Sequence, residues 1–325
     1  MENLVQQAQR FITDYGENGY VIAKKVLLSD SKIAEPIREV LGYLIEEAWP
    51  NRQHPALISM SCEAAGRFRH LPDEVSAALV LLTGAADMHD DIVDKSRTKA
   101  HVPTPVGKFS PDIVLLAGDI LLLKSLTQLS IACEAFSVET RREVHGLVEA
   151  GFFELGTATA RERAFKGKLS VDPSKYREII QAKGAVSEAC ARIGAAIAQA
   201  EPRVANVLGH IGRTLGVLMT LRSEFGDLCT PAELRNRWRN EVLPLPLFLA
   251  FHDESAKHEI LGLLEQRLTN KNVKKINAAV LKTKQVTDLK VEMQLIAQKE
   301  EAALEALNCN REPFKMLLRL SLTER

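Results

Sequence analysis

The chain has 325 residues, and its 42 Lys and Arg residues balance its 42 Asp and Glu residues, so the formal net charge at pH 7 is zero. This balance argues against binding to nucleic acid or to an anionic membrane through overall charge, and any charged ligand must be held by local patches. Hydrophobic residues make up 46% of the chain, a share typical of a soluble globular protein.

The cysteines and the first residues of the chain indicate the compartment. Five cysteines are widely spread and include no CxxC pair, which argues against a disulfide framework or a zinc site and fits a reducing environment. Residues 1–17 lack the basic start and the apolar core of a signal peptide. The longest apolar runs are about a dozen residues and carry acids, which is too short and too charged for a membrane span. We therefore expect a cytoplasmic protein without a transmembrane segment.

The first half of the chain predicts two buried helices separated by a loop. Residues 74–84 are almost entirely apolar or small, which is typical of a buried helix. The stretch 100–111, with its three prolines and a glycine, predicts a loop, and the apolar run 113–123 predicts a second helix. Four aspartates lie between the first helix and the loop: Asp87, Asp90, Asp91 and Asp94.

The second half of the chain also favours helices. Asp172 is placed to cap a helix over residues 173–184, and the alanine-rich residues 185–200 favour another. Apolar residues recur at helical spacing through residues 286–307. A β-strand can be argued only for residues 241–251, and two prolines disfavour it there. With no linker or internal repeat in between, these segments predict one all-α domain.

The four aspartates lie at i, i+3, i+4 and i+7, so a helix places them on one face. Like charges at this spacing repel one another, and the partial negative charge at the C-terminal end of a helix adds to the cost. The bases that follow, Lys95, Arg97 and Lys99, can each neutralise one acid. A divalent cation compensates several acids at once, and carboxylate oxygens suit Mg²⁺ or Ca²⁺. The pattern therefore favours a metal site over an acidic helix end that is neutralised by bases.

Residues 89–122 resemble the first aspartate-rich region of the trans-type, head-to-tail prenyl diphosphate synthases. Those enzymes carry H-D-D-x-x-D, a short basic loop, P-T and then L-A-G-D. The matching residues are His89, Asp90, Asp91, Asp94, Pro103, Thr104, Leu116, Ala117, Gly118 and Asp119. Tyr176 and Lys183 are similar to the family's Y-x-x-I-x-x-K motif, and residues 215–228 occupy the place of its second acidic motif. The resemblance covers residues 35–255 and leaves residues 256–325 undetermined.

The resemblance implies an all-α isoprenoid synthase bundle with a central cavity, as a single domain over residues 1–325. In that family two acidic regions hold about three Mg²⁺ ions, which bind an allylic prenyl diphosphate and draw off its pyrophosphate before isopentenyl diphosphate attacks the cation. The implied catalytic residues are Asp90, Asp91 and Lys183. The implied metal ligands are Asp90, Asp91, Asp94, Glu224 and Asp227. The implied diphosphate-binding residues are Arg52, His54, Lys99 and Lys183. A homodimer is also expected from the resemblance.

The basic residues that the family uses for isopentenyl diphosphate are partly replaced. In the family's G-G-K-R-x-R-P, Arg52 is retained, but Asn51 stands in place of the Lys and His54 in place of the second Arg. His54 can donate a hydrogen bond, and it would restore one charge if protonated. In the family's R-R-G, Lys99 keeps one charge, and Ala100 does not match.

The second acidic motif is altered more strongly. The family's D-D-x-x-D is replaced by Ser223, Glu224 and Asp227. Glu224 and Asp227 retain helical spacing and can ligate Mg²⁺, whereas Arg222 beside them could pair with them instead. The first acidic region is intact and has Asp87 as an additional acid.

Three functions are consistent with this pattern. We favour a Mg²⁺-dependent prenyltransferase that condenses an allylic diphosphate with isopentenyl diphosphate to a longer all-trans prenyl diphosphate. The reduced basic site favours instead a terpene synthase or diphosphate lyase that acts on the allylic diphosphate alone. The altered second acidic motif favours a non-catalytic regulatory subunit that forms a heteromer with an active prenyl synthase. The intact first motif supports catalysis, because a subunit without activity has no physical need for four clustered acids.

Overall fold

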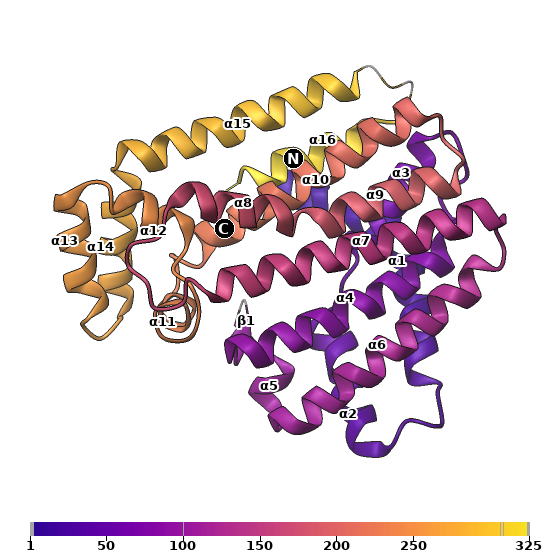
Figure 1. Cartoon of the computed structure of the whole chain (residues 1–325), viewed down its shortest axis with the longest axis horizontal. Coiled ribbons are helices and arrows are strands. Elements are labelled where there is room, and N and C mark those ends of the chain that lie inside the picture. The colour runs from indigo at the N-terminus through magenta and orange to yellow at the C-terminus, as the bar shows by residue number, and fades with distance from the viewer. Residues whose placement is uncertain (1–2, 100, 306, 308, 324–325) are drawn as a thin grey trace. The chain divides into compact units, whose positions relative to one another are not determined.

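In the computed structural model the described residues, 3–99, 101–305, 307 and 309–323, are mostly helical (Figure 1). Ala100 lies outside the described residues. The elements in chain order are α1 (Leu4–Leu28), α2 (Glu35–Tyr43), the π-helix η1 (Leu44–Ala48), α3 (Gln53–Ala64), α4 (Asp73–Asp94), β1 (Thr98–Lys99), β2 (Val102–Pro103), α5 (Pro105–Lys108), α6 (Pro111–Cys133), α7 (Val138–Arg163), α8 (Pro173–Lys183), α9 (Ala185–Ile197), α10 (Pro202–Gly226), α11 (Pro231–Asn240), α12 (Leu245–Ala250), α13 (Glu254–Leu264), α14 (Asn270–Leu281), α15 (Lys284–Leu304) and α16 (Glu312–Ser321). The predicted all-α fold class is confirmed.

The chain divides into two compact units. Unit 1 comprises Met1–Glu149, Ser187–Gly212 and Leu307–Met316, and unit 2 comprises Ala150–Val186, Arg213–Ala306 and Leu317–Arg325. Unit 1 contains the first acidic region, and unit 2 contains the second. The single domain expected over residues 1–325 stays a prediction.

The core of unit 1 joins α1, α2, α4 and α6, and α4 and α6 lie side by side along much of their length (Figure 1). Its buried side chains include Leu27, Leu41, Leu81, Met88 and Leu121. Their burial removes apolar surface from water, which is the main force that holds the helices together. The core therefore fixes the position of the last turns of α4, where the aspartates lie.

The helix predicted over residues 74–84 is confirmed as part of α4. Asp73 and Glu74 lie in its first turn, where the partial positive charge of the helix end favours acids. The helix ends before Lys95, whose φ of 55° is in the left-handed region. The four aspartates thus occupy the last turns of a mostly buried helix, as expected.

The loop predicted after α4 contains a short antiparallel pair of strands, β1 and β2. Thr104 binds the end of the preceding segment twice, since its N–H donates to Arg97 O at 3.0 Å and its Oγ1 donates to Ser96 O at 2.5 Å. Gly107 packs so closely against the same backbone that a Cβ there would lie 2.0 Å from Arg97 O. These contacts fold β1 back toward α4 and so place Lys99 near the aspartates.

In unit 2 the predicted start of α8 is confirmed. Asp172 Oδ1 accepts the N–H of Ser174 at 2.9 Å, and the helix ends at Lys183, before Gly184. Residues 241–251, where a strand was disfavoured, contain the short helix α12, whose N-cap is Pro244. Proline is tolerated there because the first turn of a helix needs no N–H partner.

The amphipathic helix predicted near the C-terminus is confirmed as α15. Leu289, Met293 and Leu304 are buried on it, as expected from their spacing. Ile296 is half-buried, and Leu307 is buried but lies beyond the end of the helix. The periodicity therefore located the helix and most of its inner face.

All five cysteines lie in the described part of the chain, and none of them is in a disulfide. Cys62, Cys133 and Cys190 are buried, Cys309 is half-buried and Cys229 is exposed. Within the described residues, α6 and α10 are long and apolar enough to cross a membrane by length and composition alone. The cytoplasmic location stays a prediction.

Candidate active site

The first acidic region is organised around Lys99. This lysine reaches from β1 to α4, and its Nζ lies 2.7 Å from Asp87 Oδ1 and 2.7 Å from Asp91 Oδ1. The Asp91 side chain is fully buried, and that of Asp87 is 14% exposed. Asp90 and Asp94 lie one turn apart on the same helix and are half-buried. Of the three bases that follow the aspartates, Lys99 is therefore the one that binds two of them.

Burial makes this cluster electrostatically costly. Desolvation raises the pKa of Asp91 to about 7, against the opposing effect of Lys99, and it raises the pKa of Asp87 in the same way. Burial alone would lower the pKa of Lys99, but Asp87 and Asp91 raise it above its usual value. Among the described residues neither oxygen of Asp91 has a hydrogen bond of normal geometry. A buried carboxylate whose oxygens lack hydrogen bonds is stabilised when a further cation binds to it.

His89 and Asp119 meet between α4 and α6. His89 Nε2 lies 3.3 Å from Asp119 Oδ1, and a Cβ at Gly118 would lie only 2.7 Å from the same nitrogen. The Asp119 side chain is 59% exposed, although the apolar run around it suggested a buried acid. The match to L-A-G-D therefore includes a glycine that lets α6 approach α4 beside the aspartates.

The positive charge of Arg52 is already paired with Glu17 in unit 1. Its Nε donates to Glu17 Oε2, its Nη2 donates to Glu17 Oε1 at 3.3 Å, and its guanidinium lies 3.8 Å from the centroid of the Tyr20 ring. A bidentate carboxylate pair and a cation–π contact hold the side chain in place. To bind a diphosphate, Arg52 must share or leave Glu17.

His54 carries no charge at neutral pH. Desolvation lowers its pKa to about 4. Asn51 Nδ2 donates to His54 Nδ1 at 2.7 Å and to Thr83 Oγ1 at 3.0 Å, and its Oδ1 accepts the N–H of Gln53. Only a neutral imidazole has a nitrogen that can accept such a bond. The charge that protonation of His54 would add is therefore absent at pH 7.

The second acidic region is occupied by Arg237 of α11. Its Nη2 donates to Glu224 Oε1 at 2.6 Å, and its Nε donates to Asp227 Oδ2 at 2.9 Å. Glu224 is 2% exposed, and its Oε2 accepts the N–H of Leu245 at 2.7 Å. Arg222, which the sequence suggested as a partner of these acids, donates to Thr323 O at 3.0 Å. Ser223 lies beside them at the end of α10.

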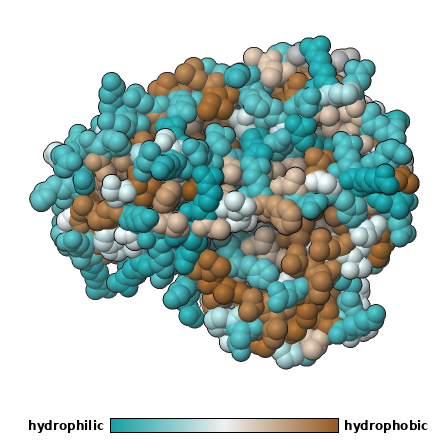
Figure 2. All heavy atoms as spheres, viewed as in Figure 1, coloured by the Kyte–Doolittle hydropathy of each residue, from teal (hydrophilic) through white to brown (hydrophobic). Residues whose placement is uncertain are grey.

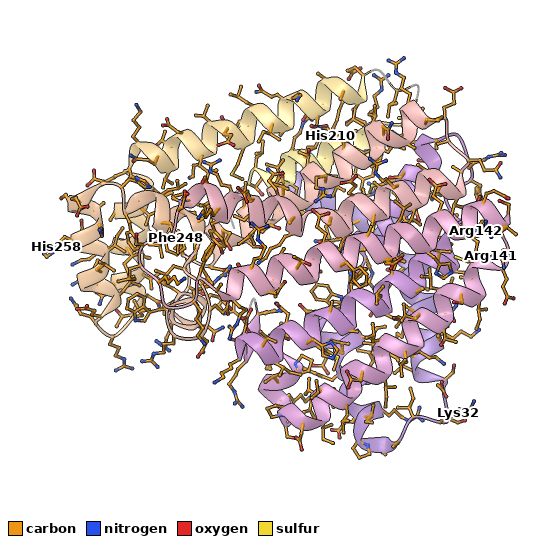
Figure 3. The ribbon with its side chains drawn as sticks, viewed as in Figure 1. Lys32, Arg141, Arg142, His210, Phe248 and His258 are labelled. Atoms are coloured by element: carbon orange, nitrogen blue, oxygen red, sulfur yellow. The ribbon has the colours of Figure 1, made fainter. Side chains whose placement is uncertain are left out.

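Lys183 belongs to the same network. Its Nζ pairs with Glu162 Oε2, and the hydroxyl of Tyr176 lies 2.8 Å from Glu162 Oε1 and 3.3 Å from both oxygens of Glu224. Phe248, labelled in Figure 3, packs edge-on against Tyr176 with ring centroids 5.8 Å apart. The network is therefore covered by aromatic rings and largely removed from water.

Burial and the two bases, Lys183 and Arg237, shift the pKa values of the acidic groups in this network. Burial alone would raise the pKa of Glu162, but Lys183 and Arg237 lower it below its usual value. Burial raises the pKa of Glu224 despite Arg237, and it raises that of the Tyr176 hydroxyl. The sequence reasoning missed Glu162 and Arg237, since neither belongs to a matched motif. It identified Tyr176 as part of the Y-x-x-I-x-x-K motif but gave it no role.

The two acidic regions differ in their capacity for a metal ion. Within the described residues no three His, Cys, Asp or Glu side chains are arranged as a metal site. Mg²⁺ does not require three, because it commonly takes one or two carboxylates and completes its shell with water and phosphate oxygens. Asp90, Asp91 and Asp94 fit this mode, since buried oxygens of Asp91 lack hydrogen bonds. Glu224 and Asp227 do not fit it, because Arg237 binds both.

A family model described as Polyprenyl synthetase matches residues 35–280 of the chain. A geranylgeranyl diphosphate synthase from Sulfolobus acidocaldarius is 25% identical over 167 residues, which cover 51% of this chain and 51% of that protein. The chain spans about half the length of the curated relatives that it matches.

Solved structures resemble the whole chain. The crystal structure of a geranylgeranyl pyrophosphate synthetase from Pyrococcus horikoshii has a TM-score of 0.83 at 19% identity and covers 98% of this chain and 100% of its own. A polyprenyl synthase from Caulobacter crescentus, crystallised with calcium and isoprenyl diphosphate, has a TM-score of 0.80 at 19% identity and covers 97% of this chain and 98% of its own. The predicted isoprenoid synthase fold is confirmed by these likenesses.

Proposed function

Because the chain belongs to the polyprenyl synthetase family, we propose that it is a Mg²⁺-dependent prenyltransferase. It ionises an allylic prenyl diphosphate and condenses the allylic group with isopentenyl diphosphate to a longer all-trans prenyl diphosphate. The observation that carries this proposal is the first acidic region, where the buried carboxylate of Asp91 has no hydrogen bond of normal geometry among the described residues and lies among three further aspartates.

Three aspartates and one lysine of the first acidic region have a role in this proposal. Asp90, Asp91 and Asp94 would hold the metal ion and through it the diphosphate. A bound Mg²⁺ supplies a Lewis acid that makes the diphosphate a better leaving group. Lys99 adds a positive charge at the same place, and its ammonium can donate a charge-assisted hydrogen bond to a phosphate oxygen.

We propose that diphosphate is bound by Lys183, Arg52 and His54. Their existing contacts in the structure limit how they can do so. To bind a diphosphate, Lys183 must share its ammonium with Glu162 or leave it, and Arg52 must share its guanidinium with Glu17 or leave it. Neutral His54 can contribute a hydrogen bond but no charge. Under these conditions we propose that isopentenyl diphosphate binds more weakly than the allylic diphosphate.

A product assay tests the proposed reaction. Purified protein is incubated with Mg²⁺ and an allylic diphosphate, with and without isopentenyl diphosphate, and the products are separated by chromatography. We expect a longer prenyl diphosphate only when both substrates are present. Asp90→Ala or Asp91→Ala should lower Mg²⁺-dependent turnover at least ~100-fold, because each removes a charge that acts on the leaving group. Asp14→Ala on the exposed face of α1 is the matched control, and unchanged turnover in the Asp90 and Asp91 variants would contradict the metal assignment.

The second candidate function is a lyase that ionises the allylic diphosphate without isopentenyl diphosphate. It is favoured by the pairing of Arg52 with Glu17 and by the neutral His54, which together leave little charge for a second diphosphate. The same assay identifies it by a hydrocarbon or alcohol that forms in the absence of isopentenyl diphosphate.

A third candidate is a regulatory subunit that forms a heteromer with an active prenyl synthase. It is favoured by Arg237, which binds both acids of the second region. In the assay this function would give no product from the chain alone and altered product on addition of an active synthase.

We also propose that the chain forms a homodimer through α6. The helix is apolar on two faces, one buried in unit 1 and one exposed. Figure 2 shows hydrophobic side chains gathered on the surface over this helix. The exposed ones are Leu115, Leu116, Leu123, Leu126 and Ile131. Exposed leucine side chains gathered on one helix are typical of a surface that is covered by a partner, and we assign this face to a second copy of the chain.

A further inference from the structure

The side chain of Arg237 fills the second acidic region with hydrogen bonds from all three of its nitrogens. Nε and Nη2 bind Asp227 and Glu224, Nη1 donates to Val242 O at 3.3 Å, and Nη1 also lies 3.4 Å from Glu241 Oε2. The side chain is 13% exposed. A guanidinium is permanently charged and presents its donors in a planar fork, so it suits two carboxylates one helical turn apart.

Glu224 has little capacity left for a metal ion. Its Oε1 accepts from Arg237, its Oε2 accepts the backbone N–H of Leu245, and the Tyr176 hydroxyl lies within 3.3 Å of both oxygens. Mg²⁺ requires close octahedral ligands at about 2.1 Å. It could reach this carboxylate only by displacing the guanidinium, since two cations in this position would repel each other.

The two acidic regions therefore differ in how far the protein's own bases compensate their acids. In unit 2, Arg237 binds Glu224 and Asp227, and Lys183 binds Glu162, so the protein itself supplies the positive charge. In unit 1, one lysine is shared by Asp87 and Asp91, and the oxygens of Asp91 lack normal hydrogen bonds within the described residues. The negative charge of the first region therefore favours binding of a cation from solution. In the second region Arg237 already occupies that position.

We propose that Arg237 takes the place of a metal ion at the second acidic region, so that the first aspartate cluster alone binds the metal that accompanies a diphosphate. This inference deepens the proposed function and rests on it for the role of Asp90 and Asp91. It implies fewer bound Mg²⁺ ions than the family pattern of two metal-binding regions.

Metal binding tests the inference without any requirement for turnover. Mn²⁺, which replaces Mg²⁺ as a spectroscopic probe, is titrated into the full-length protein with inorganic pyrophosphate, and bound Mn²⁺ is counted by electron paramagnetic resonance. We expect Asp90→Asn to weaken Mn²⁺ binding at least tenfold and Asp227→Asn to change it less than twofold. Loss of a bound Mn²⁺ in Asp227→Asn would overturn the inference.

Removal of the guanidinium gives the complementary result. Arg237→Gln should gain Mn²⁺ binding that the wild type lacks, whereas Arg237→Lys should not, because it keeps a positive charge at the same place. Arg239→Gln, an exposed arginine on the same helix, is the matched control. A folded Arg237→Gln protein without additional Mn²⁺ binding would overturn the inference.

Circular dichroism checks that each variant folds. If Arg237→Gln does not fold, Mn²⁺ binding by Asp227→Asn decides whether the second acidic region binds a metal ion. A protein without prenyl transfer but with this pattern of Mn²⁺ binding would contradict the proposed function and leave the inference standing. The two failures are thus distinguishable.

Discussion

Burial determines the charge of His54, and this has a consequence for stability. Its pKa is about 4 in the folded chain and close to 6.5 in an unfolded chain, so between these values the unfolded state binds more protons. The stabilising contribution is complete above pH 6.5 and is lost as the pH falls toward 4, with a slope of at most about 1.4 kcal/mol per pH unit. We expect His54→Gln to lose this component of the slope, as measured by urea unfolding between pH 7.5 and pH 4.5.

The control for this measurement is His258→Gln on α13, an exposed histidine labelled in Figure 3. It removes one imidazole from the chain without disturbing Asn51 or Thr83. An equal change of slope in both variants would contradict the assignment to His54.

Residue types and spacing predicted much of the first acidic region and little of the second. The aspartates were placed on one helical face because short-range periodicity is enough for that. Arg237 could not be predicted, since it is one of three arginines in a short basic stretch that is typical of an exposed helix. Only the tertiary arrangement of α10 and α11 decides which of them meets Glu224 and Asp227. The neutral state of His54 was missed for the same reason, because burial is a property of the fold.

Among the helices, the close packing of α4 and α6 depends on the absence of a side chain at Gly118. Gly118→Ala would place a Cβ 2.7 Å from His89 Nε2 and would force the ring to move beside Asp90. We expect a loss of about 1–3 kcal/mol in the free energy of unfolding, as is usual for overpacking. Thermal unfolding measures the loss, and activity at limiting Mg²⁺ measures the disturbance of the aspartates.

A second helical glycine provides the comparison. Gly146 in α7 is exposed, and a Cβ there would meet nothing within 4 Å. Gly146→Ala should therefore raise stability by up to about 1 kcal/mol through helix propensity alone. If Gly118→Ala shifted the melting temperature in the same direction, the proposed contact with His89 would be wrong.

For the whole molecule, the exposed face of α6 governs the expected assembly. Leu123 is 67% exposed on that face, and Leu123→Glu should shift a dimer to monomer by raising its dissociation constant at least ~100-fold, because it buries a charge in an apolar interface. Sedimentation velocity measures the change. Val291→Glu on α15, at an apolar position that is 47% exposed, is the matched control. A wild-type monomer that instead binds lipid vesicles through α6 would contradict the homodimer.

The charge pair at the second acidic region also restricts how the protein can change. Loss of Arg237 alone leaves Glu224 and Asp227 without the guanidinium that pairs with both, at a cost of about 3–5 kcal/mol, a large part of the stability of an ordinary domain. Loss of Glu224 alone costs less, because the guanidinium keeps Asp227 and Glu241 as partners. A change to a metal-binding pair of acids by loss of Arg237 must therefore pass through a less stable protein or acquire a compensating substitution first. The arginine and the two acids are expected to be inherited together, as one epistatic unit.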